Sequence, residues 1–227
     1  MKTRTVTALL ILLLATLAAH AQNLEAVLSA MDQAAADFKT AQTDFVWDNY
    51  TKVVDDHDLQ NGIMYVRRQG GDLQMSADIQ SPDKKFVLFT AGVVSVYLPK
   101  AGQVTEYNAG KNKTDFETFL VLGFGGRGHD LEKSFDVKYA GTEQVQGIKA
   151  EKLELTPKAK KVSSMFNKIT LWVDPSRGVS VQQLFNTPSG DYRLAKYNNI
   201  KLNEKLSNDV FKLKTSGRVT YVRPNAQ

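Results

Sequence analysis

The stretch GFGGRG at 123–128 matches, letter for letter, the G-x-G-x-x-G pattern with which dinucleotide-binding enzymes hold a pyrophosphate. That chemistry requires the glycines to follow a strand and to open a helix within a βαβ unit. The preceding residues, KTDFETFLVL, instead predict a short apolar helix with Phe116, Phe119 and Leu120, which Gly123 would end. We therefore interpret the glycines as the exit of a helix and not as a nucleotide site.

Other residues with chemical potential do not form a convincing catalytic set. DDHD at Asp55–Asp58 has the residue types of a metal site, but it lies between two predicted strands, where a polar run indicates a solvated turn. His57 and His129 stand in no H-x-x-x-H pair, and no G-x-S-x-G is present. The absence of cysteine excludes disulfides, thiolate metal ligands and a cysteine nucleophile. We predict a binding protein without metal or cofactor, and not an enzyme.

The first residues predict export. Lys2 and Arg4 precede an apolar run, Val6–Ala18, that is shorter than the roughly 20 residues of a transmembrane helix. AHA at Ala19–Ala21 is a small-x-small cleavage site. We expect a signal peptide over 1–21, cleavage after Ala21 and a single mature domain over 22–227; an uncleaved membrane anchor is the alternative.

The charge pattern does not predict a nucleic-acid-binding protein. The formal net charge is +5, and it falls by two if the leader is removed with Lys2 and Arg4. A weak excess of this kind lacks the concentrated basic patch that nucleic-acid recognition needs. TPKAKKVSS at 156–164 is basic, but it follows a predicted strand. We interpret it as a solvated loop, and docking of a partner is the alternative.

The spacing of apolar residues changes near Phe45. Before it, an apolar stripe at three- and four-residue spacing predicts an amphipathic helix; its members are Leu24, Val27, Leu28, Met31, Ala35 and Phe38. After it, about ten or eleven short strands alternate with turn sequences such as SPDK, PKAG and DPSRG. The last short strand is expected at VFKLK. With no βαβ alternation, the pattern predicts a mainly β fold with a strongly curved antiparallel sheet or barrel.

Several predicted strands, including FVLF and VVSVYL, are apolar on both faces. Both faces must then be covered, by a packed core or by an apolar ligand in a cavity. The candidate lining residues are Met64, Val66, Leu73, Met75, Ile79, Val87 and Phe89, with Phe116, Phe119 and Leu120 as their cover. This covering helix, followed by a flexible glycine exit, is either a movable lid or a fixed connector.

Several segments in order, NGIMYVRR, VSVYLPKAGQVTEY, LELTPKA and ITLWVDPSRGVSVQQLFNTPSGDYRLAKYNNIKLN, give the chain a family resemblance. It resembles the periplasmic outer-membrane lipoprotein carriers (LolA-like). The resemblance implies an incomplete, half-open antiparallel β-barrel wrapped on an N-terminal helix, with an apolar concave face and a short helical lid. It also implies a periplasmic monomer that shelters lipoprotein acyl chains. The implied partners are an inner-membrane ABC-type releasing complex and, where present, an outer-membrane acceptor.

The resemblance aligns Arg68 with an arginine that latches the lid of these carriers by hydrogen bonds in the ligand-free state. Arg68 shares a predicted strand face with Met64 and Val66, where an unpaired cation is costly. The alternative is that Arg68 ends the strand and reaches solvent, as Arg67 does on the opposite face. Gln69 replaces the usual proline and QGGDLQ carries extra residues, so the strand pairing after Arg68 stays open.

Three other functions remain as alternatives to lipoprotein carriage. One is an envelope-stress sensor of the same fold, although such sensors carry a further C-terminal domain that we do not expect here. Another is an enzyme on a small barrel, which would need a convergent acid–base pair in the cavity. The third is a carrier of lipids or glycolipids, which the sequence does not separate from a lipoprotein carrier.

Overall fold

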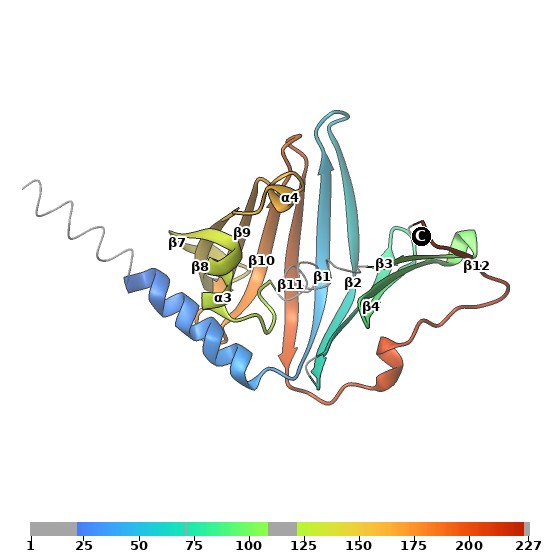
Figure 1. The fold of residues 1–227 in the computed structure, drawn as a ribbon, viewed down its shortest axis with the longest axis horizontal. Helices are drawn as coiled ribbons and strands as arrows, with labels where there is room; N and C mark the ends of the chain where they lie inside the picture. Colours follow the sequence, from blue (N-terminus) through green and yellow to red (C-terminus); the bar gives the residue numbers. More distant parts are fainter. Residues whose placement is uncertain (1–21, 71, 109–121, 225–227) are drawn as a thin grey trace, which may run out of the picture.

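The computed structural model of the chain describes residues 22–70, 72–108 and 122–224 (Figure 1). The predicted signal peptide and the predicted lid residues Phe116, Phe119 and Leu120 lie outside the described residues.

Twelve strands form one open, curved sheet in the order β12-β6-β5-β4-β3-β2-β1-β11-β10-β9-β8-β7 (Figure 1). The strands are β1 (Thr40–Thr51), β2 (Asp56–Gln69), β3 (Asp72–Ser81), β4 (Lys85–Thr90), β5 (Val93–Leu98), β6 (Gln103–Asn108), β7 (Phe135–Val145), β8 (Ile148–Pro157), β9 (Lys168–Asp174), β10 (Val179–Asn186), β11 (Tyr192–Leu202) and β12 (Thr220–Val222). The predicted mainly β, incomplete barrel is confirmed: β12 and β7 are the two ends of the sheet and do not pair with each other. Most neighbouring strands are joined by hairpins. The pairing of β1 with β11 joins the two halves of the sheet in its middle.

The predicted amphipathic helix is confirmed and spans 22–37. Its buried residues Val27, Leu28 and Met31 belong to one apolar cluster with Leu153 and Leu171 of β8 and β9. Figure 1 shows the helix lying along the half of the sheet formed by β7 to β10. Because the other faces of the helix are polar, this contact supplies most of what holds it in place.

The connections include short helices: η1 (Pro99–Ala101), α3 (Gly128–Ser134), α4 (Lys160–Ser163) and η3 (Asn208–Phe211). The strand expected at VFKLK is wrong. Val210 and Phe211 lie in η3, which Ser207 begins by accepting a hydrogen bond from the Asp209 amide through its side chain. A local cap therefore competes successfully with strand pairing at this point.

After β11, the C-terminal segment crosses the convex face of the sheet before it adds a further strand. The Arg67 guanidinium lies 4.3 Å from the centre of the Phe211 ring, and the Tyr97 hydroxyl accepts a hydrogen bond from the Ser216 amide at 3.2 Å. The chain then adds β12 to β6 as a parallel neighbour. The sheet therefore has twelve strands where about ten or eleven were expected, and β12 is a parallel neighbour in an otherwise antiparallel sheet.

The interpretation of DDHD as a turn holds only for its first residue. Asp55 ends the turn with a positive φ of 49°, whereas β2 begins at Asp56 and pairs His57 with Tyr50. The rings of Tyr50 and His57 lie 4.8 Å apart, and His57 Nδ1 is 2.8 Å from an Asp48 carboxylate oxygen. These cross-strand contacts explain why a polar segment extends the strand.

The register beyond Arg68 is regular. Arg68 pairs with Leu73 and Gln69 pairs with Asp72. The extra residues of QGGDLQ therefore lengthen the hairpin without shifting the faces of its strands.

Truncation of the helix anchor should destabilise the whole fold. Leu28 is 1% exposed, so Leu28→Ala leaves a cavity between helix and sheet and should lower the free energy of unfolding by about 2–5 kcal/mol. Urea unfolding measures this change. Leu59→Ala makes the same chemical change at a side chain that is 58% exposed, and equal losses for the two variants would contradict the packing described.

Candidate functional site

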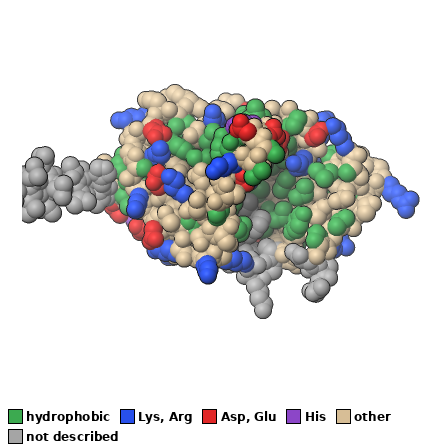
Figure 2. Space-filling view, turned by 90° about the horizontal axis from the view of Figure 1, so that it is seen from above, with side chains coloured by type: hydrophobic (Ala, Val, Ile, Leu, Met, Phe, Trp, Pro, Cys, Tyr) green, Lys and Arg blue, Asp and Glu red, His purple; other side chains and the backbone are tan. Residues whose placement is uncertain are grey.

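A cavity of about 100 Å³ lies on the concave side of the sheet, where its two halves meet. Its walls come from β1, β2, β3, β10 and β11 and from the segment after residue 121; they are Trp47, Met64, Met75, Leu122, Phe124, Gln183, Phe185, Arg193, Ala195 and Tyr197. In the space-filling view, hydrophobic side chains gather along a hollow near the middle of the molecule (Figure 2). An apolar concavity with few polar groups is the usual form of a ligand site.

The structure brings together the predicted lining residues on the strands. Strand pairing places Met64 opposite Ala77, Val66 opposite Met75, and Met75 opposite Phe89, so their side chains share one face. The predicted residues Met64, Val66, Leu73, Met75, Ile79 and Phe89 belong to one buried cluster, and Val87 packs against it while partly exposed. Of these, Met64 and Met75 reach the cavity itself.

The opposite wall was missed by sequence reasoning. Trp47, Phe185 and Tyr197 line it together with Arg193 and Gln183. The signal was present as alternation in DFVWDN and YRLAKY, where every second residue faces the same side. The sequence alone does not bring β1 beside β11, because the two strands are more than 140 residues apart in the chain.

The segment 122–125 is wedged into the seam between the two halves. Leu122 and Phe124 are 2% and 1% exposed, and the Phe124 ring meets Tyr197 edge-on at 4.9 Å. A Cβ on Gly123 or Gly125, both with positive φ, would lie 2.1 Å from the Ser180 hydroxyl or 2.4 Å from the Phe38 ring. The described part of the glycine exit is therefore tightly packed and not a loose linker.

Arg68 joins three elements beside this segment. Its guanidinium donates to the Gly125 carbonyl at 2.8 Å and to the Ala35 carbonyl at 3.5 Å, and it lies 5.8 Å from the centre of the Phe38 ring. Its side chain is half-buried, so it does not simply end the strand in solvent. Arg67, on the opposite face, bonds Gln74 through two nitrogens at 3.0 and 2.6 Å.

The polar groups at the base of the cavity satisfy one another. The Tyr197 hydroxyl donates to the Gln183 side-chain oxygen at 3.0 Å, and the Gln183 amide donates to the Leu122 carbonyl. Burial raises the pKa of Tyr197 to about 12, so the phenol stays neutral at physiological pH. The described residues that line the cavity include no carboxylate and no histidine, and their mainly apolar side chains suit binding of an apolar group.

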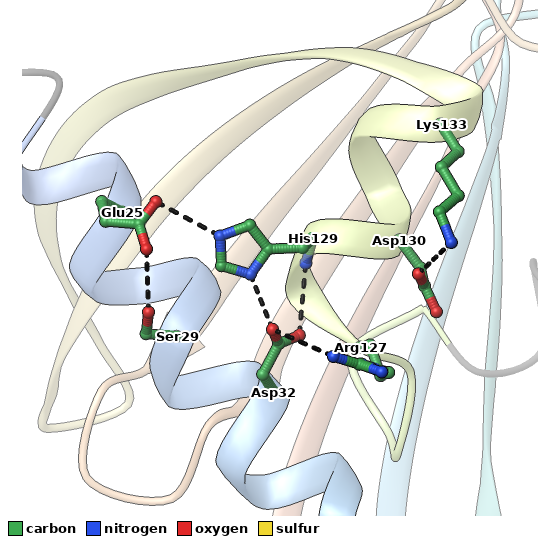
Figure 3. Close-up of polar contacts among 7 residues, drawn as sticks. All are labelled: Glu25, Ser29, Asp32, Arg127, His129, Asp130 and Lys133. Carbon is green, nitrogen blue, oxygen red and sulfur yellow. Dashed lines mark hydrogen bonds and ion pairs between the residues drawn. The ribbon is translucent and has the colours of Figure 1, made fainter.

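A second polar cluster lies outside the cavity and ties α3 to the N-terminal helix (Figure 3). His129 Nδ1 is 2.6 Å from an Asp32 carboxylate oxygen, and its Nε2 is 3.2 Å from Glu25. Hydrogen bonds to Asp32 and Glu25 raise the pKa of His129. Burial opposes the shift at Asp32, but the hydrogen bonds from His129 outweigh it and lower the pKa of that carboxyl.

Within the described ranges, no group of three or more His, Asp and Glu side chains is placed to hold a metal ion. In the same part of the chain, no helix has the length and hydrophobicity needed to span a membrane.

Comparison with known families identifies the architecture. The family model described as "Outer membrane lipoprotein carrier protein LolA" matches residues 36–214, which include every strand except β12. The chain belongs to the LolA family. The strands of the concave apolar face and the inward-facing Arg68 lie within the matched residues. No curated protein sequence matched the chain.

Two solved structures support the same fold at low sequence identity. MucB aligns with a TM-score of 0.54 and 14% identity over 89% of this chain and 65% of its own length. An uncharacterised conserved protein from Thermus thermophilus aligns with a TM-score of 0.54 and 12% identity, over 86% of this chain and 96% of its own. A LolA superfamily protein from Nitrosomonas europaea also aligns, with a TM-score of 0.42 and 14% identity, over 83% of this chain and 97% of its own. The chain thus spans about two thirds of the length of MucB.

The His129 cluster should make stability depend on pH. Because folding raises the pKa of His129, its imidazolium stabilises the fold below the unfolded pKa of about 6.5, and this contribution is lost as the pH rises through the folded value. Urea unfolding from pH 5.5 to 8.5 should show a decline that His129→Gln removes. Asp32→Asn, which removes the nearer of the two carboxylates that contact His129, should reduce this decline. An unchanged decline in His129→Gln would assign the effect to other groups.

Proposed function

We propose that this protein is a periplasmic carrier that shelters the acyl chains of lipoproteins on its concave face and delivers them towards the outer membrane. The observation that carries the proposal is the open sheet with an apolar cavity at the seam of its two halves, in a chain of the LolA family. The leader over 1–21, with cleavage after Ala21, would place the mature chain in the periplasm. Release by an ABC-type complex and transfer to an outer-membrane acceptor complete the proposed route.

The energetics favour a carrier of this form. Three acyl chains carry on the order of 40 methylenes, and exposing each to water costs roughly 0.8 kcal/mol. A carrier must cover this surface and still release it. An open sheet can widen by a change in its curvature with every strand pair kept, whereas a closed barrel cannot, because every strand of a barrel is held on both sides.

The cavity is too small for the acyl chains of a lipoprotein in the conformation described. A cavity of about 100 Å³ is smaller than the roughly 150 Å³ that holds a single benzene. A lipoprotein's acyl chains therefore require displacement of the segment with Leu122 and Phe124. Arg68 holds the same segment through the Gly125 carbonyl, so it opposes opening and lowers the affinity for acyl chains.

Binding should depend on the acyl groups. A fluorescence titration of the chain from Gln22 to Gln227 with a dye-labelled triacylated lipopeptide should show saturable binding. The deacylated twin of that peptide, which has no chain to shelter, should not bind. Absence of binding by either peptide would mean that the concave face is a closed core.

Removal of the Arg68 contact should slow ligand release. Arg68→Leu deletes a hydrogen bond that only the closed state makes, a change of about 1.5–3 kcal/mol for a charged donor. Transfer of the labelled lipopeptide to acceptor vesicles should therefore slow roughly 10- to 100-fold.

Arg67→Leu is the matched control, because it removes the neighbouring arginine from the convex face. It should leave the transfer rate as in the wild type. A transfer rate of Arg68→Leu equal to that of the wild type would contradict the latch role of Arg68.

A further inference from the structure

Arg193 is a cation in the wall of the cavity. It lies on β11, where strand pairing places it opposite Asn49 of β1 and Phe185 of β10. Its guanidinium carbon is 4.9 Å from the centre of the Phe185 ring and 5.7 Å from that of Trp47. Two aromatic faces at these distances hold a guanidinium by cation–π attraction without using its N–H donors.

The N–H donors of Arg193 have no protein acceptor among the described residues. Other arginines have protein acceptors. Arg68 donates to two backbone carbonyls, and Arg177 Nε lies 2.7 Å from an Asp174 carboxylate oxygen. The neighbouring Tyr197 is neutral at physiological pH and donates its hydroxyl hydrogen bond to Gln183. The guanidinium therefore retains five donors for a partner outside the chain.

Arg193 is also placed where a ligand can reach it. Desolvation by the surrounding walls lowers the pKa of Arg193, but a guanidinium in a protein remains charged at physiological pH. The side chain is nevertheless exposed to solvent, because the concavity is open. A cation in partly apolar surroundings gains most from an anion that completes its hydrogen bonds.

The apolar side of the same cavity lies next to this charge. Met64, Met75 and Phe124 line it together with Arg193, so the charge and the apolar side chains belong to one continuous site. The small volume suits part of one chain.

We propose that Arg193 binds the anionic headgroup, a carboxylate or a phosphate, of a single-chain lipid whose acyl chain lies between Met64, Met75 and Phe124. The proposal rests on the carrier function above and extends its ligands to anionic amphiphiles. Trp47 and Phe185 are the positioning residues, since they orient the guanidinium without contacting the headgroup themselves.

The test compares two probes that differ only in headgroup charge. The chain from Gln22 to Gln227 is titrated with 11-(dansylamino)undecanoic acid and with its methyl ester. The wild type should bind the acid roughly 10- to 100-fold more tightly than the ester, as for a charge-assisted hydrogen bond. Arg193→Gln should bind both equally, with an unchanged affinity for the ester.

Controls separate the charge from the fold. Arg193→Lys keeps the charge but not the planar fork and should show an intermediate preference. Arg218→Gln makes the same substitution at an exposed site on the C-terminal segment and should behave as the wild type. Circular dichroism checks that each variant is folded.

The outcomes distinguish this proposal from the carrier function. Binding of the triacylated lipopeptide without an acid preference, or with a preference that Arg193→Gln retains, overturns the headgroup site alone. Binding of neither the lipopeptide nor the probes overturns both. Competition with oleate and with oleoyl lysophosphatidate then compares a carboxylate headgroup with a phosphate headgroup. If neither lipid displaces the dansyl probe, the proposal is overturned.

Discussion

The structure depends on keeping the concave face of an open sheet dry without closing the sheet into a barrel. A barrel protects its interior by pairing every strand on both sides, whereas this sheet ends at β12 and β7. Its concave side therefore needs separate covers. The helix at 22–37 covers the half built from β7 to β10, and the segment with Leu122 and Phe124 fills the seam. Between these covers and the sheet lies the cavity, whose walls come from β1, β2, β3, β10 and β11.

Two arginines of the concave face are held in different ways, and the difference gives each its character. Arg68 donates hydrogen bonds to backbone carbonyls at the helix end and in the seam segment. These bonds therefore depend on the relative position of the two elements. Arg193 rests on two aromatic rings and keeps its donors. The first interaction responds to the conformation of the protein, and the second leaves a charge available within an otherwise apolar wall.

The convex face is covered by other means. After β11, the chain passes η3 and the contact between Arg67 and Phe211, and then adds the short strand β12 beside β6. A short terminal strand limits the edge that the sheet presents for pairing with other chains. On the concave side, the close backbone approach of Gly123 and Gly125 packs the seam segment against Ser180 and Phe38.

The sequence by itself determined the N-terminal helix, most of the strands and one wall of the site, because periodicity and turn chemistry are local properties. The stripe from Leu24 to Phe38 specified the helix, and alternation in β2 and β3 placed Met64, Val66 and Met75 on one face. Only the tertiary structure decided the second wall, since Trp47, Phe185 and Arg193 meet through the pairing of β1 with β11 and of β10 with β11. It also decided that Gly123 and Gly125 are buried, because they pack against Ser180 and Phe38, which lie far from them in the chain. Local periodicity shows which face a side chain takes, but long-range strand pairing decides what it faces.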